Sequence, residues 1–99
     1  MANLTVGSTY RFKPNSDGIP EKDGTDWTTA TMKIRFRGPD GFDTGYVACT
    51  AAGGGAWYYD NASTLFTVAK AGQWQRSWQG VEGAVVLNGE DIPFLVVPT

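Results

Sequence analysis

The residues that most often carry out catalysis are scarce in this 99-residue chain. It contains no histidine, which removes the commonest general base, the Ser-His-Asp arrangement and the usual zinc ligand. Its one cysteine, Cys49, stands among small apolar residues, where a free thiol usually packs as a buried hydrophobe. Activation of this thiol would need a neighbouring base, and there is no histidine to supply it. We therefore predict no catalytic residue and no enzyme activity.

Carboxylates gather in one polar stretch, Pro14–Asp26, which contains Asp17, Glu21 and Asp23 and is rich in Gly and Pro. Their spacing does not fit an EF-hand calcium loop, which needs ligands at alternate positions and a closing Glu. Nothing places two carboxylates across a cleft, as glycoside hydrolysis requires. The triglycine at 53–55 lacks the Lys-Ser/Thr that completes a phosphate-binding loop. We interpret both stretches as loops and predict no metal and no cofactor.

The four tryptophans are more than one small core should need. Trp74 begins a predicted strand, and we assign it to the core. Trp57 and Tyr59 share one face of a short aromatic segment, and Trp78 adds a third large ring. Exposed aromatic residues are typical anchors of protein interfaces. We therefore predict an interaction surface of Trp57, Tyr59 and Trp78, which Trp27 could extend in a sugar-binding stripe.

The overall charge and composition exclude several classes of protein. The net charge is −2 and the eight basic residues are spread along the chain, so we predict no nucleic-acid partner. No apolar run reaches the roughly 20 residues of a membrane span, and no N-terminal signal region precedes Leu4. A single cysteine allows no intrachain disulfide. We expect a soluble protein that folds in a cytoplasm, contacts no membrane and relies on packing for stability.

We predict that the elements positioning these residues are strands, because no window shows apolar residues at the sustained 3.6-residue period of a helix. The clearest is Thr28–Arg37, where Ile34 and Phe36 alternate with polar residues; we assign both to the core. In Trp74–Gln79, Arg76 shares a face with both tryptophans, and we expect a cation–π stack with Trp78.

Short strands separated by turn residues fill the remaining sequence. Gly and Pro mark the turns, and Asn88–Asp91 is a hairpin signal. The other expected strands are Leu4–Phe12, Tyr46–Ala52 (buried on both faces), Trp57–Tyr59, Leu65–Val68, Ala84–Leu87 and Ile92–Val97. About seven antiparallel strands at this spacing favour one all-β domain spanning residues 1–99, an immunoglobulin-like β-sandwich. A small β-barrel is the alternative.

Several short motifs resemble those of immunoglobulin-like domains in virion proteins of tailed phages, such as the N-terminal domains of baseplate upper proteins. The opening Leu4–Thr9 is similar to their first strand, and the run from Ala30 through Gly38-Pro39-Asp40-Gly41 looks like their central strand and turn. Leu65–Gly72 followed by Trp74 resembles their "A-G-x-W" strand start, and Ile92–Val97 their last strand. The resemblance covers nearly the whole chain and carries no catalytic residues.

The resemblance implies a structural component of a phage virion or tail-like assembly: tail, baseplate, neck or head accessory. Its expected partners are virion or tail proteins, or further copies in an oligomer or ring. It would be made in the host cytoplasm and assembled into the virion. The alternative function is a carbohydrate-binding module with exposed Trp and Tyr. Most such modules are secreted, whereas we expect no export signal.

Overall fold

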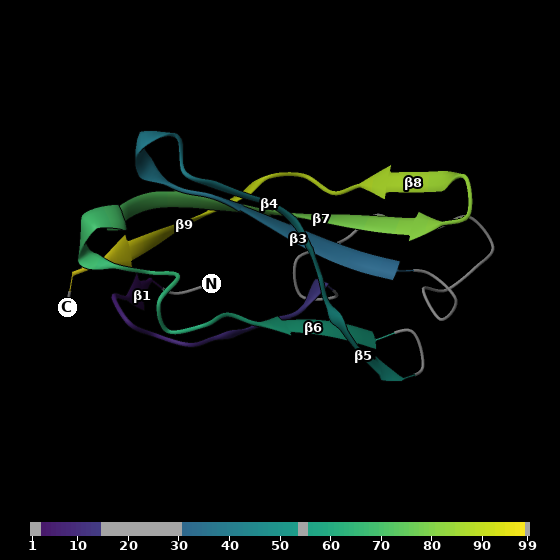
Figure 1. Ribbon diagram of the computed structural model, residues 1–99, viewed down its shortest axis with the longest axis horizontal. Helices are drawn as coiled ribbons and strands as arrows, with labels where there is room; N and C mark the ends of the chain where they lie inside the picture. The colour runs from purple at the N-terminus through teal and green to yellow at the C-terminus, as the bar shows by residue number, and fades with distance from the viewer. Residues whose placement is uncertain (1–2, 15–30, 54–55, 99) are drawn as a thin grey trace.

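The computed structural model describes residues 3–14, 31–53 and 56–98 (Figure 1). Within these ranges the chain forms nine strands and two short 3-10 helices. In chain order they are β1 (Leu4–Thr5), β2 (Arg11–Phe12), β3 (Thr31–Arg37), η2 (Pro39–Gly41), β4 (Asp43–Ala48), β5 (Thr50–Gly53), β6 (Ala56–Asp60), η3 (Val68–Lys70), β7 (Gly72–Glu82), β8 (Val85–Asn88) and β9 (Ile92–Val97). Trp27 and the acidic residues from Asp17 to Asp26 lie outside the described residues.

The strands form two sheets in two layers, so the all-β sandwich is confirmed and the closed barrel is wrong. The larger sheet has the order β1-β9-β7-β3-β4, with β8 also paired to β7, and the smaller has the order β2-β6-β5. Figure 1 shows β5 and β6 as a separate layer below β3, β7 and β8. We expected antiparallel pairing throughout. One pair differs: β1 lies parallel to β9, with Leu4 opposite Val96.

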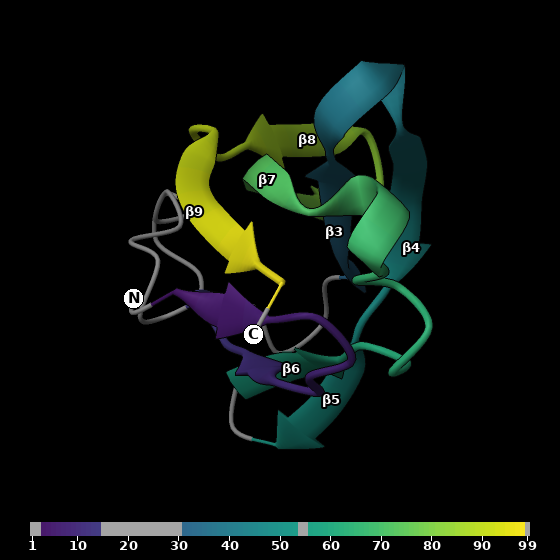
Figure 2. The ribbon, with the colours of Figure 1, turned by 90° about the vertical axis from the view of Figure 1, so that its left-hand side faces the viewer.

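One continuous stretch of chain belongs to both sheets. β4 pairs with β3, whereas β5 pairs with β6, and only Cys49 separates the two strands. The Cys49 amide donates to the Met32 carbonyl at 2.9 Å, so the ladder to β3 persists until the chain turns away. Figure 2 shows this ribbon descending from β4 to β5. The stretch Tyr46–Ala52 is mostly exposed rather than buried on both faces, because it forms the rim of both layers.

The predicted hairpin at Asn88–Asp91 is wrong. β8 and β9 do not pair with each other; both pair with β7, one after the other along the same side. The hairpin turn is instead Gly83-Ala84, closed by the pair Glu82↔Val85, and Gly83 has φ +57. A two-residue turn with Gly first suits the twist of paired strands. The eleven-residue β7 is long enough to pair with two shorter strands in succession.

A second difference concerns Leu65–Val68, which forms no strand. The Leu65 amide donates to the Ala62 carbonyl at 3.0 Å in a turn, and η3 begins at Val68. Phe66 between them is fully buried, and its carbonyl accepts a hydrogen bond from the Gly7 amide at 2.8 Å. The segment therefore inserts a ring between the layers without taking part in either ladder.

The core is a cluster of aromatic rings between the two layers. Trp74, Ile34 and Phe36 are each 0% exposed, so the predicted core positions lie inside. Phe36 contacts four rings edge-on or tilted, and Trp74 meets Phe66 edge-on with their centroids 5.0 Å apart. The Trp74 indole Nε1–H donates to the Lys70 carbonyl at 2.7 Å, which satisfies its one polar group in the interior.

Gly38, just after β3, makes room for this tryptophan. A Cβ at position 38 would lie 2.9 Å from two atoms of the Trp74 indole, closer than carbon atoms pack. Glycine is therefore required here by the ring rather than by the backbone angle, since Gly38 has φ −121. The turn between β3 and β4 is thus shaped by a residue of β7.

Candidate interaction surface

The structure separates the three predicted surface residues. Trp78 is only 1% exposed and belongs to the core, so its assignment to the interaction surface is wrong. It occupies the inward face of β7, directly opposite Ile34 of β3. The signal for this was in the sequence: Trp74 and Trp78 lie four residues apart on one strand and share a face. Assigning Trp74 to the core places Trp78 there too.

Trp57 and Tyr59 of β6 are partly buried and pack against the core. The Tyr59 ring lies 5.8 Å from Phe36, centroid to centroid, at 45°. Tyr58, between them, faces the other way and stacks on the Arg11 guanidinium, 4.0 Å from the ring centroid. The smaller sheet therefore directs its aromatic pair inward, and the three predicted residues form no common exposed patch.

Arg76 lies in the interior with only 3% of its surface exposed. Its guanidinium carbon is 5.5 Å from the centroid of Phe94 and 5.8 Å from that of Phe12. Phe94 of β9 and Phe12 of β2 are therefore cation–π partners of Arg76. A buried guanidinium between rings joins the two layers at this point.

The exposed apolar side chains are ones the sequence reading did not select. Val85 and Val86 of β8 are 46% and 49% exposed. Consecutive residues of a strand point to opposite faces, so this hairpin presents valine on both sides. Tyr46 of β4 is also exposed, beside Arg35 of β3. No local signal in the sequence identifies β8 as an edge, because edge position depends on the whole topology of the sheet.

The two open edges of the larger sheet carry little charge and no proline, although the pairing of β4 with β3 is irregular between Arg35 and Arg37. Natural edge strands are blunted by charge, proline or shortness. No charged residue and no proline occurs from Thr44 to Gly53 or from Ala84 to Gly89. Among the described strands, β4 pairs only with β3, and β8 pairs only with β7.

The edges formed by β1, β2 and β9 are protected. β1 and β2 have two residues each, and β2 carries Arg11 in a bidentate ion pair with Asp60. β9 contains Pro93, which lies outside its short pairing with β1 at Val96 and Val97. Within the larger sheet, the contrast sets β4 and β8 apart as the edges most open to a further strand; β5, which ends the smaller sheet, is also uncharged and free of proline.

An ion pair anchors the base of the β4 edge. The Arg35 guanidinium donates two hydrogen bonds to the Asp43 carboxylate, and the Gly45 amide donates a third at 2.8 Å. The hydrogen bonds from Arg35 hold the pKa of Asp43 well below its usual value, and the Gly45 amide adds to this effect. The pair neutralises the one charge of β4 and leaves the strand beyond it uncharged.

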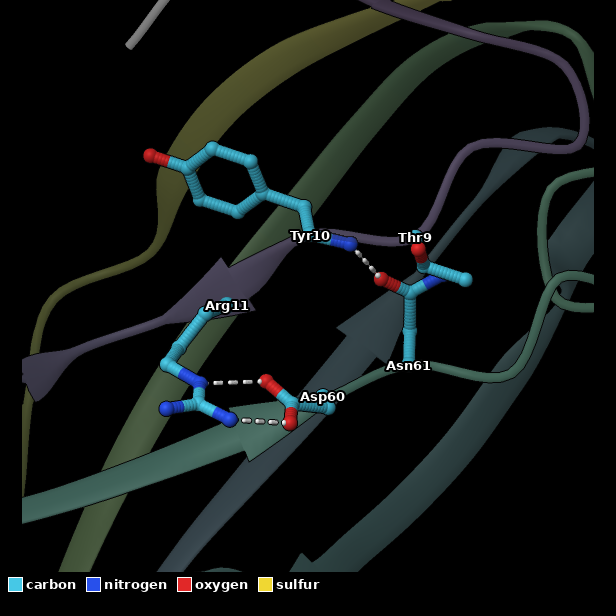
Figure 3. A pocket seen from close by; sticks show the side chains of 5 residues that line it. All are labelled: Thr9, Tyr10, Arg11, Asp60 and Asn61. Atoms are coloured by element: carbon cyan, nitrogen blue, oxygen red, sulfur yellow. Dashed lines mark hydrogen bonds and ion pairs between the residues drawn. The ribbon is translucent and has the colours of Figure 1, made fainter.

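A shallow pocket of about 450 Å³ lies between β2 and the end of β6. Figure 3 shows its lining of Thr9, Tyr10, Arg11, Asp60 and Asn61. The Arg11 and Asp60 side chains bind each other, and this pairing lowers the pKa of Asp60.

Asn61 lines this pocket, and its side chain has a structural role. Its Oδ1 accepts from the Tyr10 amide at 2.8 Å, and its Nδ2 donates to the Ser8 and Ala62 carbonyls. The side chain is 3% exposed, so its hydrogen bonds satisfy a buried amide. The Asn61 side chain therefore holds the segment before β2 against the segment that follows β6.

The described ranges contain no group of three or more His, Cys, Asp or Glu side chains able to hold a metal ion. Burial raises the pKa of the Cys49 thiol to about 12, so the thiol stays protonated near neutral pH. No helix in the described part of the chain is long and apolar enough to cross a membrane. Comparison with protein-family models, with curated proteins and with solved structures finds no match.

Proposed function

We propose that this protein is a non-catalytic structural component of a tailed-phage virion or a related tail-like assembly, acting through protein–protein contacts. The observation that carries the proposal is the pair of proline-free open edges on one sheet, β8 and the part of β4 beyond Asp43, neither of which carries a charge. An exposed strand edge binds another chain through main-chain hydrogen bonds and needs no pocket. The motif resemblance supplies the virion context.

The chemistry of the described residues is consistent with this role. Arg11 and Asp60 bind each other, the Cys49 thiol is protonated, and Asn61 is committed to backbone partners. Under the proposal the chain is made in the host cytoplasm and assembled into the particle with virion or tail proteins or further copies. A protein without a disulfide suits that route.

The alternative, a carbohydrate-binding module, has less support. A sugar platform needs large rings that lie exposed and coplanar, but Trp78 is in the core and Trp57 and Tyr59 pack toward it. Of the exposed tyrosines, Tyr10 precedes β2 of the smaller sheet, whereas Tyr46 lies on β4 of the larger sheet. A glycan array tests this alternative: retention of one polysaccharide class that Tyr10→Ala abolishes would favour it.

Particle composition tests the proposed function. Virions or tail-like particles are purified by density gradient from a culture that produces the chain, and their proteins are quantified by mass spectrometry. We expect the chain at a fixed ratio to the major tail or head protein, retained after high-salt washing. Its absence from particles, while it is abundant in the cell, would overturn the proposal.

A further inference from the structure

We infer that Asn88 is a site of spontaneous covalent modification, deamidation, and that two hydrogen bonds at the end of β8 hold this reaction back while the protein is folded. The dipeptide Asn88-Gly89 was part of the predicted hairpin, but in the structure it ends β8 and leads on toward β9. Both strands lie along β7 (Figure 1). The dipeptide therefore makes no hairpin turn. The inference is independent of the proposed function.

The chemistry of the dipeptide makes it labile. Asparagine is a thermolabile residue, and glycine after it has no side chain to hinder attack on the carboxamide. The Gly89 nitrogen gives its proton to hydroxide and bonds to Asn88 Cγ. The Cγ–Nδ2 bond breaks, and Nδ2 leaves as ammonia with a proton from water, which restores the hydroxide. Water then opens the cyclic succinimide at either carbonyl and yields aspartate or isoaspartate, with no oxidation or reduction.

A main-chain hydrogen bond withholds the attacking nitrogen. The Gly89 N–H donates to the Trp78 carbonyl at 2.7 Å, so the proton that must leave is bound and the nitrogen is held against β7. Asn88 is the last residue of β8 and is paired with Gln79, so its backbone is extended. In an extended residue the following nitrogen does not face the carbonyl carbon of the side chain. The ring therefore cannot close until this end of β8 opens.

A side-chain hydrogen bond holds the group that is attacked. Gln79 Nε2 donates to Asn88 Oδ1 at 2.9 Å across the ladder between β7 and β8. The bond fixes the carboxamide beside Gln79 and adds to the free energy needed to open the end of β8. A donor to Oδ1 also polarises the carbonyl, but this cannot promote attack while the Gly89 nitrogen is out of reach.

Close packing favours glycine at position 89 in spite of this lability. A Cβ there would lie 3.3 Å from the Trp78 carbonyl oxygen, closer than a methyl group usually packs. The φ angle of Gly89 is not positive, so the distance rather than the backbone angle favours glycine. The same contact with Trp78 that favours the labile dipeptide therefore also protects it.

The two products should affect the fold differently. Aspartate keeps the main chain unchanged, and its carboxylate can still accept the hydrogen bond from Gln79. Isoaspartate carries the main chain through the former side chain, which adds a methylene before Gly89 and displaces its N–H from the Trp78 carbonyl. A long opening of this end would therefore leave some molecules unable to restore it.

Reaction rates in the folded and unfolded chain test the inference. Wild-type protein is incubated at one mildly alkaline pH with and without denaturing guanidinium chloride, and peptide mass spectrometry follows aspartate and isoaspartate at each asparagine. Deamidation of Asn88 should be at least about tenfold slower in the folded protein, because attack requires opening. In denaturant Asn88 should react several-fold faster than Asn61, which precedes alanine. Equal rates in the two states, or an unfolded Asn88 no faster than Asn61, would overturn the inference.

A matched pair of β7 variants tests the side-chain hydrogen bond. Gln79→Ala should speed deamidation of the folded protein about two- to tenfold, the range expected for one modest hydrogen bond, and leave the rate in denaturant unchanged. Gln73→Ala makes the same change on the same face of β7, opposite Leu95, and should react as wild type does. Circular dichroism and urea unfolding establish that both variants fold. A rate for Gln79→Ala no higher than that for Gln73→Ala would contradict the inference.

Hydrogen exchange provides a test without variants. The Gly89 amide should exchange at least about tenfold more slowly in the folded protein than in the unfolded chain, because its N–H is bonded to Trp78. Exchange at the unfolded rate would show that the nitrogen is free to react, against the inference. These measurements do not bear on particle composition, so their failure and failure of the proposed function are distinguishable.

Discussion

The two central strands and the two open edge strands of the larger sheet use apolar residues in opposite ways. β3 and β7 turn large side chains such as Ile34 and Trp74 inward, where neither is exposed. β8 leaves Val85 and Val86 about half exposed, and β4 presents small residues such as Ala48. Stability should therefore depend on the centre of the sheet, while association depends on its edges. The predictions below test this division, from the largest expected effect to the smallest.

Removing the Trp74 ring should cause the largest loss of stability. Trp74→Ala should lower the free energy of unfolding by about 3–5 kcal/mol, because it leaves a cavity among Phe42, Phe66 and Phe94. Trp74→Phe should cost clearly less, since it keeps most of the ring contacts. Urea unfolding measures both. Equal losses, or indole fluorescence quenched as freely as that of a surface tryptophan, would contradict a core position.

Neighbouring positions on β3 should differ sharply. Ile34→Ala should lower the free energy of unfolding by about 2–5 kcal/mol, since Ile34 is fully buried opposite Trp78. Arg35→Ala should have a much smaller effect, because its ion pair with Asp43 is solvent-accessible. The two variants are compared by urea unfolding under one set of conditions, and similar losses would show that the two faces of β3 are misassigned.

A methyl group at position 38 should disturb the core from the turn. Gly38→Ala should cost about 1–3 kcal/mol, because its Cβ would clash with the Trp74 ring 2.9 Å away. In the Trp74→Phe background the clash is relieved, so the same change should cost less. A double-mutant cycle by urea unfolding measures the coupling, and strictly additive effects would rule out the ring as the cause.

The β8 edge should tolerate change in the monomer. Val86→Thr keeps the β-branched shape of a half-exposed side chain and should change the free energy of unfolding by less than about 0.5 kcal/mol. Unfolding is measured at a concentration low enough to keep the protein monomeric. A loss comparable with that of Ile34→Ala would erase the distinction between edge and centre.

The smallest expected effect is a dependence of the free energy of unfolding on acidic pH. The folded-state pKa of Asp43 lies below its ordinary value of 3.8 because Arg35 and the Gly45 amide bond to the charged form. The stabilising contribution is therefore complete above that ordinary value and is lost as the pH falls below it. Asp43→Asn should be less stable than wild type at neutral pH, and the difference should shrink in acid. A difference that is constant with pH, measured by urea unfolding, would contradict this.

The alternation of polar and apolar residues correctly predicted several core positions. The polar and apolar pattern of Thr28–Arg37 placed Ile34 and Phe36 inside, and the strand start placed Trp74 there. Alternation reports which residues share a face, but only the second sheet decides which face is covered. Trp78 was placed on the surface although it shares the face of Trp74.

Pairing was harder to predict than strand position. Asn88-Gly89 is a stronger turn signal by composition than Gly83-Ala84, but the length of β7 lets it pair with both β8 and β9. The open edges were also missed, because composition does not show which strand ends a sheet. Edge position is a property of the whole topology, and so is the candidate interaction surface.

The parallel pairing of β1 with β9 has a consequence for synthesis. A ribosome makes Leu4 long before its partner Val96, so the larger sheet cannot be completed until β9 has emerged. During that interval the hairpin β3–β4 can already form, with the uncharged edge of β4 exposed on a nascent chain. Neighbouring ribosomes on one messenger would bring several such edges close together. The order of synthesis therefore leaves the β1–β9 pairing to a late step of folding, after β9 has been made.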